Sequence, residues 1–274
     1  MFICVKMSEK NDEGLCMLPL QRKQALLTYL ARQGAATMKE LSDHFGVSEM
    51  TIRRDIQLLE QENRVQRSHG GVIYRELASG GEEPDLATKQ AHNVDVKERL
   101  ALYAAEHFVK SRDVLILENG TTVSRMAEHL SAFDQLTLLT NGMDTLSRFR
   151  PFVSERHAII CCGGMLREVS GTFVGPVAEQ FFAEYHADTL FLSALGFNPE
   201  AGFTDPNLLD TQVKKAMIRS AKKVVMLLDS SKLGKRYFST VAHLADIDVL
   251  VTDEGISDEH KQLMEESGVE LHTV

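Results

Sequence analysis

The sequence has little cysteine, no long apolar run and no nucleotide-binding glycine motif. Its 274 residues include four cysteines. Cys4 and Cys16 lie in the N-terminal tail, whereas Cys161 and Cys162 are adjacent, a spacing that suits neither an ordinary disulfide nor a tetrahedral zinc site. We therefore expect no metal site and a reducing, cytoplasmic compartment. No apolar run approaches the roughly 18 residues of a membrane span, and Phe2–Val5 is too short for a signal-peptide core. The absence of GxxxxGK[ST] argues against a nucleotide-hydrolysing enzyme.

The net negative charge of the chain is unevenly distributed along the sequence. The net charge is −9, but residues 17–75 hold nine Lys/Arg against six Asp/Glu, and residues 76–274 hold nineteen against thirty. A basic head on an acidic body is expected when only the head contacts nucleic acid, because cationic side chains neutralise phosphates. The length exceeds that of one ordinary domain, so we expect two unequal domains.

Residues 37–71 carry the pattern of two short amphipathic helices joined by a turn. The apolar positions of the two helical segments are Leu41, Phe45 and Val47 and then Ile52, Ile56 and Leu59. Gly46 ends the first helix, and Ser48 can cap the second by accepting its free backbone N–H groups. Helices joined this tightly cross at a steep angle, which leaves the polar face of the second helix outward. The pattern predicts a helix-turn-helix.

The outward face of the second helix presents Glu49, Thr51, Arg53 and Arg54. Hydroxyl and guanidinium donors of this kind read base edges and phosphates in a major groove. The alternative is a solvated helix face without a ligand. Because the pair of arginines follows a capped turn, we predict contact with operator double-stranded DNA by Ser48, Thr51, Arg53 and Arg54.

A small hairpin is predicted directly after these helices. Residues 64–67 form an alternating pattern typical of a strand, Ser68–Gly71 form a glycine-containing turn, and Val72–Tyr74 form the returning strand. The result is a winged helix-turn-helix with Arg67 and His69 near the tip of the wing, where both are expected to contact DNA. His69 could otherwise be an ordinary turn residue.

The run GVSxxTIRRDIxxLExxxxVxRxHGG resembles the N-terminal domain of the DeoR family of bacterial sugar-catabolism regulators. The TIRRD core followed at a fixed distance by HGG carries the resemblance. The family usually has Gly at the end of the recognition helix, where this chain has Asn63, the next-best residue for a left-handed terminator. The family normally starts near Met17, so we expect residues 1–16 to be a disordered extension or the product of an upstream start codon. The winged helix-turn-helix then occupies residues 17–75.

A second domain is expected over residues 91–274, after a linker at 76–90. ELASGGEEPDLA combines glycine, proline and acids, as linkers do. A helix with Leu100, Ala104 and Phe108 on one face follows. Short, continuous apolar runs then alternate with helical stretches, at 114–117, 136–140, 157–161, 189–194, 224–228 and 248–252. This pattern predicts an α/β domain with a mainly parallel sheet covered on both faces.

Polar, glycine-rich segments follow five of these strands. They are Glu118–Thr122, Thr140–Gly142, Cys162–Arg167, Ser193–Gly196 and Asp229–Lys232. Ligands of such sheets bind at the C-terminal ends of the strands. Gly-Thr-Thr before a helix can cradle a phosphate, a Gly-Gly pair allows close backbone approach, and Arg167 and Lys232 add charge. Each segment alone could be a helix cap or a tight turn, but together they favour a phosphorylated polar ligand.

The resemblance to the DeoR family continues here and covers residues 17–252. NGTT, LLTN, CGGMLR, SALGF, VKKAMI and DSSKLG are similar to blocks of its C-terminal sensor domain, which resembles ribose-5-phosphate isomerase and coenzyme A transferases in fold and commonly senses phosphorylated sugars. The resemblance implies effector contacts by Asn119, Gly120, Thr121, Thr122, Gly163, Gly164, Lys214 and Lys232, and the strand ends add Asn141 and Arg167. Many members carry DSGTT where this chain has ENGTT, which alters the neighbouring contact to sugar hydroxyls. Lys214 could alternatively be a surface charge.

An isomerase is the alternative function. It would need an acidic base beside a lysine, for which Asp205, Asp210 and Lys214 are available. The family's isomerase relatives carry denser acidic clusters around that strand, and an enzyme would not explain the head. We therefore expect a regulator and not an enzyme, without a cofactor. The expected activity is repression of a carbohydrate-catabolism operon. A symmetric homo-oligomer on repeated half-sites would supply useful DNA affinity, and the effector must favour one arrangement of the heads.

Overall fold

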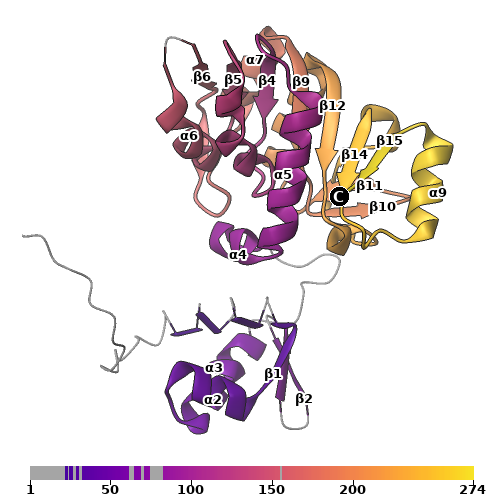
Figure 1. Cartoon of the computed structure of the whole chain (residues 1–274). Helices are drawn as coiled ribbons and strands as arrows, with labels where there is room; N and C mark the ends of the chain where they lie inside the picture. The colour runs from indigo at the N-terminus through magenta and orange to yellow at the C-terminus, as the bar shows by residue number, and fades with distance from the viewer. Residues whose placement is uncertain are drawn as a thin grey trace, which may run out of the picture. The chain divides into compact units, whose positions relative to one another are not determined.

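A computed structural model describes residues 22–23, 25–26, 29–30, 33–61, 65–68, 71–74, 83–154 and 156–274 (Figure 1). The chain divides into two compact units, with the boundary between residues 76 and 77. His69 and Asn63, to which the sequence assigned a wing contact and a helix end, lie outside the described residues, as does the N-terminal extension predicted at 1–16. Among the described residues, no helix has the length and apolarity needed to cross a membrane.

The smaller unit is the predicted winged helix-turn-helix. Its elements are β1 (Ala35–Thr37), α2 (Met38–Phe45), α3 (Glu49–Gln61), β2 (Val65–Ser68) and β3 (Gly71–Tyr74). Gly46 adopts the left-handed conformation at the end of α2, and the Ser48 Oγ accepts a hydrogen bond from the Thr51 N–H at 3.2 Å. Ile52, Ile56 and Leu59 are fully buried. The expected cap and apolar face are therefore confirmed.

A third strand, which the sequence pattern did not predict, completes the wing. β1 pairs antiparallel with β3, and the strand order is β1-β3-β2. Gly71 lies where this pairing is tightest: a Cβ there would come within 2.9 Å of the Ala36 carbonyl oxygen. The glycine at the base of the wing is thus needed for strand packing.

The larger unit is built on a seven-stranded sheet in which every pair is parallel. Its order is β15-β14-β12-β9-β4-β5-β6. The strands are β4 (Val114–Leu117), β5 (Thr137–Thr140), β6 (Ala158–Cys161), β9 (Ala187–Leu192), β12 (Ala221–Leu227), β14 (Val249–Thr252) and β15 (Glu270–Thr273). Six of these confirm the predicted strands. The seventh, β15, was missed because ELHT is polar and half exposed, as an edge strand can be.

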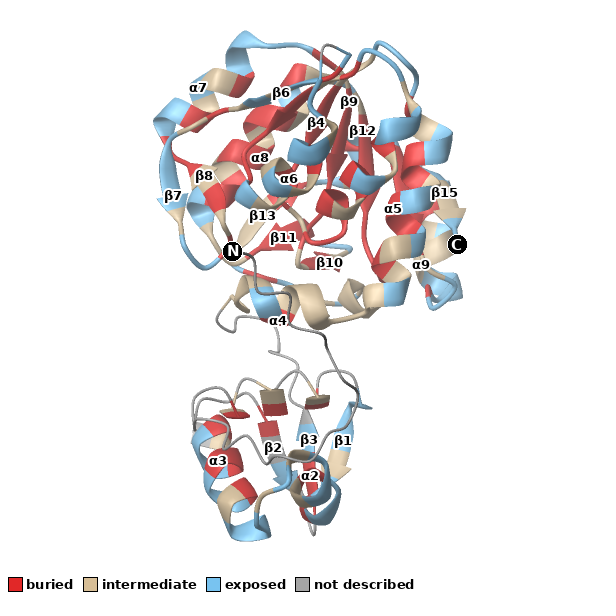
Figure 2. Cartoon of the chain, turned by 60° about the vertical axis from the view of Figure 1, so that its left-hand side comes forward, coloured by how far each residue is buried: buried red, intermediate tan, exposed pale blue. Residues whose placement is uncertain are grey.

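Helices cover both faces of this sheet, which explains why its strands other than the edge strand β15 are mainly apolar (Figure 2). One face packs against α5 (Val94–Phe108), α6 (Met143–Phe149) and the 3-10 helices η1 (Val123–Glu128), η2 (Leu130–Ala132) and η3 (Arg150–Phe152). The other face packs against α7 (Pro176–Glu184), α8 (Leu208–Ser220) and α9 (Asp258–Ser267). Each face of the sheet has its own hydrophobic core. Leu115 and Leu117 of β4 belong to the core on the α5 face, and Ile116 belongs to the core on the α8 face.

Smaller elements at the C-terminal edge of the sheet position the polar residues. They are α4 (Leu86–Ala91), the hairpin β7 (Met165–Arg167) and β8 (Thr172–Val174), the antiparallel sheet β10 (Gly196–Asn198), β11 (Gly202–Asp205) and β13 (Ser239–Ala242), and the 3-10 helix η4 (Ser230–Lys232). A further 3-10 helix, η5 (Leu244–Asp246), precedes β14. Residues 83–90, which the sequence assigned to the linker, differ from that expectation. They include α4 and contact the larger unit, where the Leu86 N–H donates to the Val169 carbonyl at 3.1 Å.

Candidate functional site

The recognition helix α3 separates the TIRRD residues onto two faces. Arg53 and Arg54 are exposed, and Arg53 makes a long, exposed ion pair with Glu49 at 3.6 Å. Asp55 faces inward, where its carboxylate accepts a hydrogen bond from the Arg22 guanidinium at 2.6 Å. The arginines are thus available to a ligand, whereas the aspartate holds α3 to the helical residues near the start of the unit.

Two further residues belong to the outward face of α3. Met50 is 79% exposed, and Gln57 is exposed as well. Both fall within the arc that Arg53 and Arg54 occupy on a helix of 3.6 residues per turn. Sequence reasoning overlooked them because neither is charged, although their spacing alone would have placed them there.

The predicted wing and cap residues are already engaged within the unit. The Arg67 guanidinium of β2 donates to Glu60 of α3 at 2.6 Å, so the wing is tied to the recognition helix. The Ser48 and Thr51 hydroxyls lie 2.9 Å apart at the start of α3. Ser48 and Thr51 therefore shape the helix start, and DNA contact by these residues remains a prediction.

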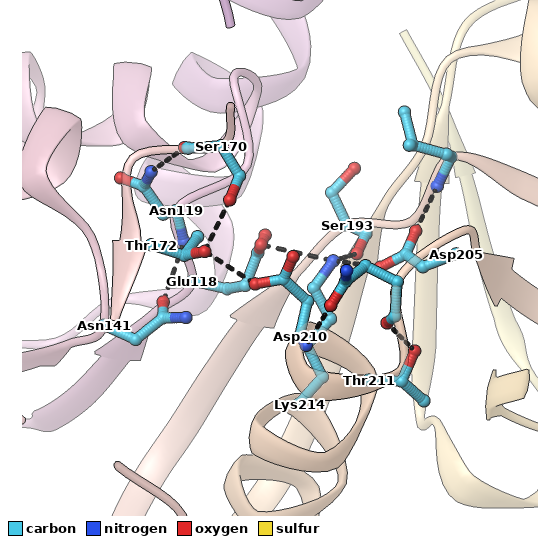
Figure 3. A network of polar contacts seen from close by, with 12 residues as sticks. Glu118, Asn119, Asn141, Ser170, Thr172, Ser193, Asp205, Asp210, Thr211 and Lys214 are labelled. Atoms are coloured by element: carbon cyan, nitrogen blue, oxygen red, sulfur yellow. Dashed lines mark hydrogen bonds and ion pairs between the residues drawn. The ribbon is translucent and has the colours of Figure 1, made fainter. Parts of the chain in front are cut away.

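In the larger unit, Lys214 is the centre of a buried ionic cluster (Figure 3). Its Nζ donates to the Ser193 carbonyl at 2.8 Å and to Asp205 at 2.6 Å, and it lies 3.2 Å from the Glu118 carboxylate. Lys214 is 7% exposed, which rules out the surface-charge alternative. Burial alone would lower the pKa of Lys214, but the adjacent Asp205 and Glu118 carboxylates raise it above its ordinary value.

Asn119 joins three loops at this edge of the sheet (Figure 3). Its Nδ2 donates to the Ser170 carbonyl at 2.9 Å, its Oδ1 accepts from the Thr145 N–H at 3.2 Å, and its own N–H donates to the Asn141 side chain at 3.3 Å. A Cβ at Gly142 would lie 1.8 Å from the Asn119 Oδ1. Asn119 therefore organises the site, and its amide is used by the protein itself.

Arg167 belongs to the same network through the β7–β8 hairpin. Its guanidinium pairs with Asp210, donates to the Ser170 Oγ at 3.1 Å, and pairs with Glu83 at 2.7 Å. The Thr172 hydroxyl donates to the second oxygen of Asp210 at 2.6 Å. Arg167 thus ties the hairpin to α8 and to the segment that precedes α4.

Two glycines of the site, Gly120 and Gly164, have close neighbours inside the protein. A Cβ at Gly120 would lie 2.6 Å from the Glu118 carboxylate, and one at Gly164 would lie 2.8 Å from the Val174 carbonyl, while Gly163 and Gly164 both have positive φ. These contacts, rather than the approach of a ligand, account for Gly120 and Gly164 in this structure. Gly163 has open space at the Cβ position.

The segment after Gly120 differs from the expected phosphate-binding helix. Thr121 and Thr122 lead into η1, a six-residue 3-10 helix whose start has no side-chain cap. A short 3-10 helix has a weaker, less regular dipole than a long α-helix. The helix-dipole part of the phosphate argument is therefore corrected, and the two buried threonine side chains remain as candidate contacts.

Seven buried side-chain polar atoms have no hydrogen-bond partner within the described residues, and three of them belong to the loops directly after β4 and β5. They are the Glu118 Oε2, the Thr122 Oγ1 and the Asn141 Nδ2, on residues that are 1–3% exposed. All three follow β4 or β5, which are adjacent and parallel. Because unpaired buried polar groups are costly, a cluster of them indicates a polar ligand.

A second charged cluster lies at the end of β12. Lys232 is 3.6 Å from Asp229, and the Asn93 side chain donates to Asp229 at 3.0 Å. Burial would raise the pKa of Asp229, but Lys232 and the other charged and polar neighbours lower it to about 2. Lys97 of α5 is 2% exposed. Burial, reinforced by the charge of Lys232, lowers the pKa of Lys97 to about 7.

Sequence reasoning overlooked Lys97 because a lysine in an amphipathic helix is usually solvated. Of the residues it did select, the structure brings Asn119, Gly120, Asn141, Arg167 and Lys214 into one network. Thr121 and Thr122 are buried beside them, and Lys232 belongs to the second cluster. No contact with either cluster is shown for Gly163.

Comparison with known proteins decides the family. The DeoR-like helix-turn-helix domain matches residues 22–77, and the DeoR C-terminal sensor domain matches residues 92–254. The chain belongs to the DeoR family. It is 35% identical to the uncharacterised transcriptional regulator YulB of Bacillus subtilis, over 94% of this chain and 98% of that one. It is 32% identical to the transcriptional regulator GlpR of Haloferax volcanii, over 92% and 97%, and 27% identical to the glycerol-3-phosphate regulon repressor of Escherichia coli, over 90% and 99%.

This DeoR-family chain is accordingly a DNA-binding transcriptional regulator, with the head and sensor domains that its sequence predicts. Among solved structures, ribose 5-phosphate isomerase A from Methanocaldococcus jannaschii is similar with a TM-score of 0.38 and 18% identity, over 52% of this chain and 56% of that one. Similarity at this level carries no conclusion about activity.

Proposed function

We propose that this DeoR-family regulator represses a carbohydrate-catabolism operon and that a phosphorylated sugar or related metabolite controls it by binding to the larger unit. The single observation that carries the proposal is the group of unpartnered buried atoms on Glu118, Thr122 and Asn141. The Glu118 carboxylate also lies 3.2 Å from the buried Lys214 ammonium. Relatives named as repressors of the glycerol-3-phosphate regulon and the aga operon support the carbohydrate assignment.

The chemistry of these atoms suits the hydroxyl groups of a sugar. The Glu118 Oε2 accepts a hydrogen bond from a hydroxyl, the Asn141 Nδ2 donates one, and the Thr122 hydroxyl does either. Lys214 supplies a fixed positive charge. We assign the effector to the ten positions named from the sequence: Asn119, Gly120, Thr121, Thr122, Asn141, Gly163, Gly164, Arg167, Lys214 and Lys232. Asn119 and Gly120 act by shaping the loop.

The smaller unit reads the operator. We assign the DNA contacts to the exposed face of α3 and to the wing, through Ser48, Thr51, Arg53, Arg54, Arg67 and His69. Met50 and Gln57 join them because they share the exposed face of α3. One head makes few base contacts, so a homo-oligomer assembled through residues 91–274, acting in the cytoplasm, provides the affinity of paired heads.

An enzymatic role is disfavoured by the way the acidic groups are held. Asp205 is paired with Lys214, and Asp210 is paired with Arg167. Both carboxylates are thus engaged in ion pairs with side chains of the protein, and neither is held free to act as a base. The proposal is therefore a sensor that binds its ligand without changing it.

The test is operator binding by the full-length protein. Fluorescence anisotropy with DNA from the gene's own promoter is measured against a panel of phosphorylated sugars and polyols, with the unphosphorylated compounds as controls. We expect at least one phosphorylated compound to shift the operator Kd by about tenfold, the scale of a coupling energy of 1–3 kcal/mol. NMR of the same mixture should show that compound unchanged. An operator Kd that no compound moves, or conversion of the compound, would contradict the proposal.

A further inference from the structure

Met50 is the most exposed apolar side chain of the recognition helix α3. It is 79% exposed, whereas Ile52, Ile56 and Leu59 of the same helix are fully buried. Counted at about 100° per residue, these three lie about 180–240° around the helix from Met50. Met50 therefore projects away from the core of the smaller unit, at the middle of the face that α3 offers to a ligand.

The side chains around Met50 are those expected of a helix that reads DNA. Arg54 and Gln57 are exposed and lie within about 40° of Met50 around α3, and the exposed Arg53 lies about 60° away. Met50 is in the first turn of α3, which begins at Glu49. The N-terminal residues of a recognition helix are the ones that contact base edges in the major groove. The position of Met50 therefore favours contact with a base over contact with the phosphate backbone.

An apolar side chain at this position narrows the range of groups that it can recognise. The thioether has no N–H or O–H donor and its sulfur is a weak acceptor, so Met50 is unsuited to reading the hydrogen-bonding pattern of a base pair. It also carries no charge that would attract a phosphate. Among the groups that base pairs present in the major groove, the C5-methyl of thymine is the apolar one. Packing Met50 against that methyl removes apolar surface of both groups from water.

We infer that Met50 contacts the C5-methyl group of a thymine in each operator half-site and is a specificity-determining residue of this regulator. The inference rests on the proposed assignment of α3 to the operator, and it names the base that one position of α3 selects. Arg53 and Arg54 supply the charge and the hydrogen-bond donors of the interface. Met50 distinguishes thymine from bases that lack the methyl group.

The experiment measures binding of the full-length protein to DNA from the gene's own promoter by fluorescence anisotropy. Each thymine of one half-site, located by footprinting, is replaced in turn by deoxyuridine, which keeps the hydrogen-bonding groups of thymine and lacks the methyl. The proteins are the wild type, Met50→Ala, Met50→Leu and a matched control, Leu102→Ala, which shortens a 40% exposed apolar side chain on α5 of the larger unit. Circular dichroism establishes that each variant is folded.

We expect one thymine of the half-site at which deoxyuridine raises the operator Kd of the wild type by about fourfold, the scale of one buried methyl group. Leu102→Ala should show the same dependence. Met50→Ala should bind the thymine and deoxyuridine operators equally, because the side chain that contacts the methyl has been removed. Met50→Leu should retain discrimination, because leucine is an apolar side chain of similar volume.

A converse probe adds the methyl group instead of removing it. At the position found with deoxyuridine, a C·G pair replaces the T·A pair, and a second operator carries 5-methylcytosine there. The wild type should bind the 5-methylcytosine operator about fourfold more tightly than the cytosine operator, and Met50→Ala should not distinguish the two. Both operators present the same hydrogen-bonding groups, so a preference of the wild type alone identifies the methyl contact.

If deoxyuridine weakens binding at no position, or weakens binding of Met50→Ala as much as that of the wild type, Met50 does not read a thymine methyl group. The assignment of Met50 is then wrong, and operator binding by the smaller unit stands. If the wild type does not bind the promoter DNA at all, both the assignment and the proposed control of this operon are wrong.

Discussion

Replacing Lys97 with methionine should stabilise the protein, and more so at low pH. Methionine has a similar length and can occupy the same space without a charge. In the folded protein the pKa of Lys97 falls from its ordinary value of 10.5 to about 7 because of burial. Below pH 7 the folded protein therefore carries the full cost of a buried ammonium, and this cost declines as pH rises from 7 to 10.5, where the unfolded chain also loses the proton.

The size of the effect follows from the same values. One pKa unit corresponds to about 1.4 kcal/mol, so the cost of the buried charge is about 5 kcal/mol at pH 6 and about 2 kcal/mol at pH 9. The gain in unfolding free energy of Lys97→Met over the wild type should thus be larger by about 3 kcal/mol at pH 6 than at pH 9. Differences in packing between the two side chains cancel in this comparison because they do not depend on pH.

The assay is urea unfolding of both proteins without effector at pH 6, 7.5 and 9, followed by circular dichroism. Lys222→Met is the control: its lysine is exposed and paired with Asp188, and both groups stay charged across this range, so its effect should not vary with pH. A Lys97→Met effect that is equally constant between pH 6 and 9 would show that Lys97 remains charged or solvated in the folded protein and would refute the reasoning.

Three further predictions concern the operator, the effector loop and the head. Arg53→Ala should weaken operator binding by roughly 1–3 kcal/mol, with a smaller loss of binding to random DNA. If fluorescence anisotropy shows equal losses of binding free energy for operator and random DNA, Arg53 contacts a phosphate and not a base. Gly142→Ala should abolish the effector response, because its Cβ would overlap the Asn119 side chain; an unshifted effector midpoint would contradict this role of Asn119. Arg22→Ala should destabilise the smaller unit by about 3–5 kcal/mol, because it leaves the Asp55 carboxylate buried without this partner. In thermal melts, the double variant Arg22→Ala/Asp55→Ala should recover part of the lost stability.

Local pattern was sufficient for the helix-turn-helix of the smaller unit and for six strands of the seven-stranded sheet. Gly46 and Ser48 act through their own backbone and immediate neighbours, so the helix-turn-helix could be read from spacing. The apolar runs that form β4 and β9 could be predicted as strands, because a continuous apolar run is typical of a strand that is buried on both faces of a sheet. The polar strand β15 could not be predicted this way, because pairing along one edge, rather than an apolar face, places it in the sheet.

The effector site was predicted in part, since parallel strands bring their C-terminal ends to one edge whatever the details of packing. Lys214 was selected, but its acceptors Asp205 and Ser193 come from β11 and the end of β9. The spacing of residues along the sequence does not predict that α8, β11 and the end of β9 come together. The same holds for Asn119, whose partners lie in α6 and in the loop after β7.

By itself, then, the sequence determined the family, the two-unit organisation and the edge of the sheet that carries the polar residues, because helical and strand periodicity and turn chemistry are local. The tertiary structure alone decided which charges are buried. Lys97 and Lys222 are both lysines within regular elements, yet Lys97 is 2% exposed and has few acceptors, whereas Lys222 is solvated beside Asp188. Desolvation depends on everything packed around a side chain, and long-range packing is the information that a linear pattern does not contain.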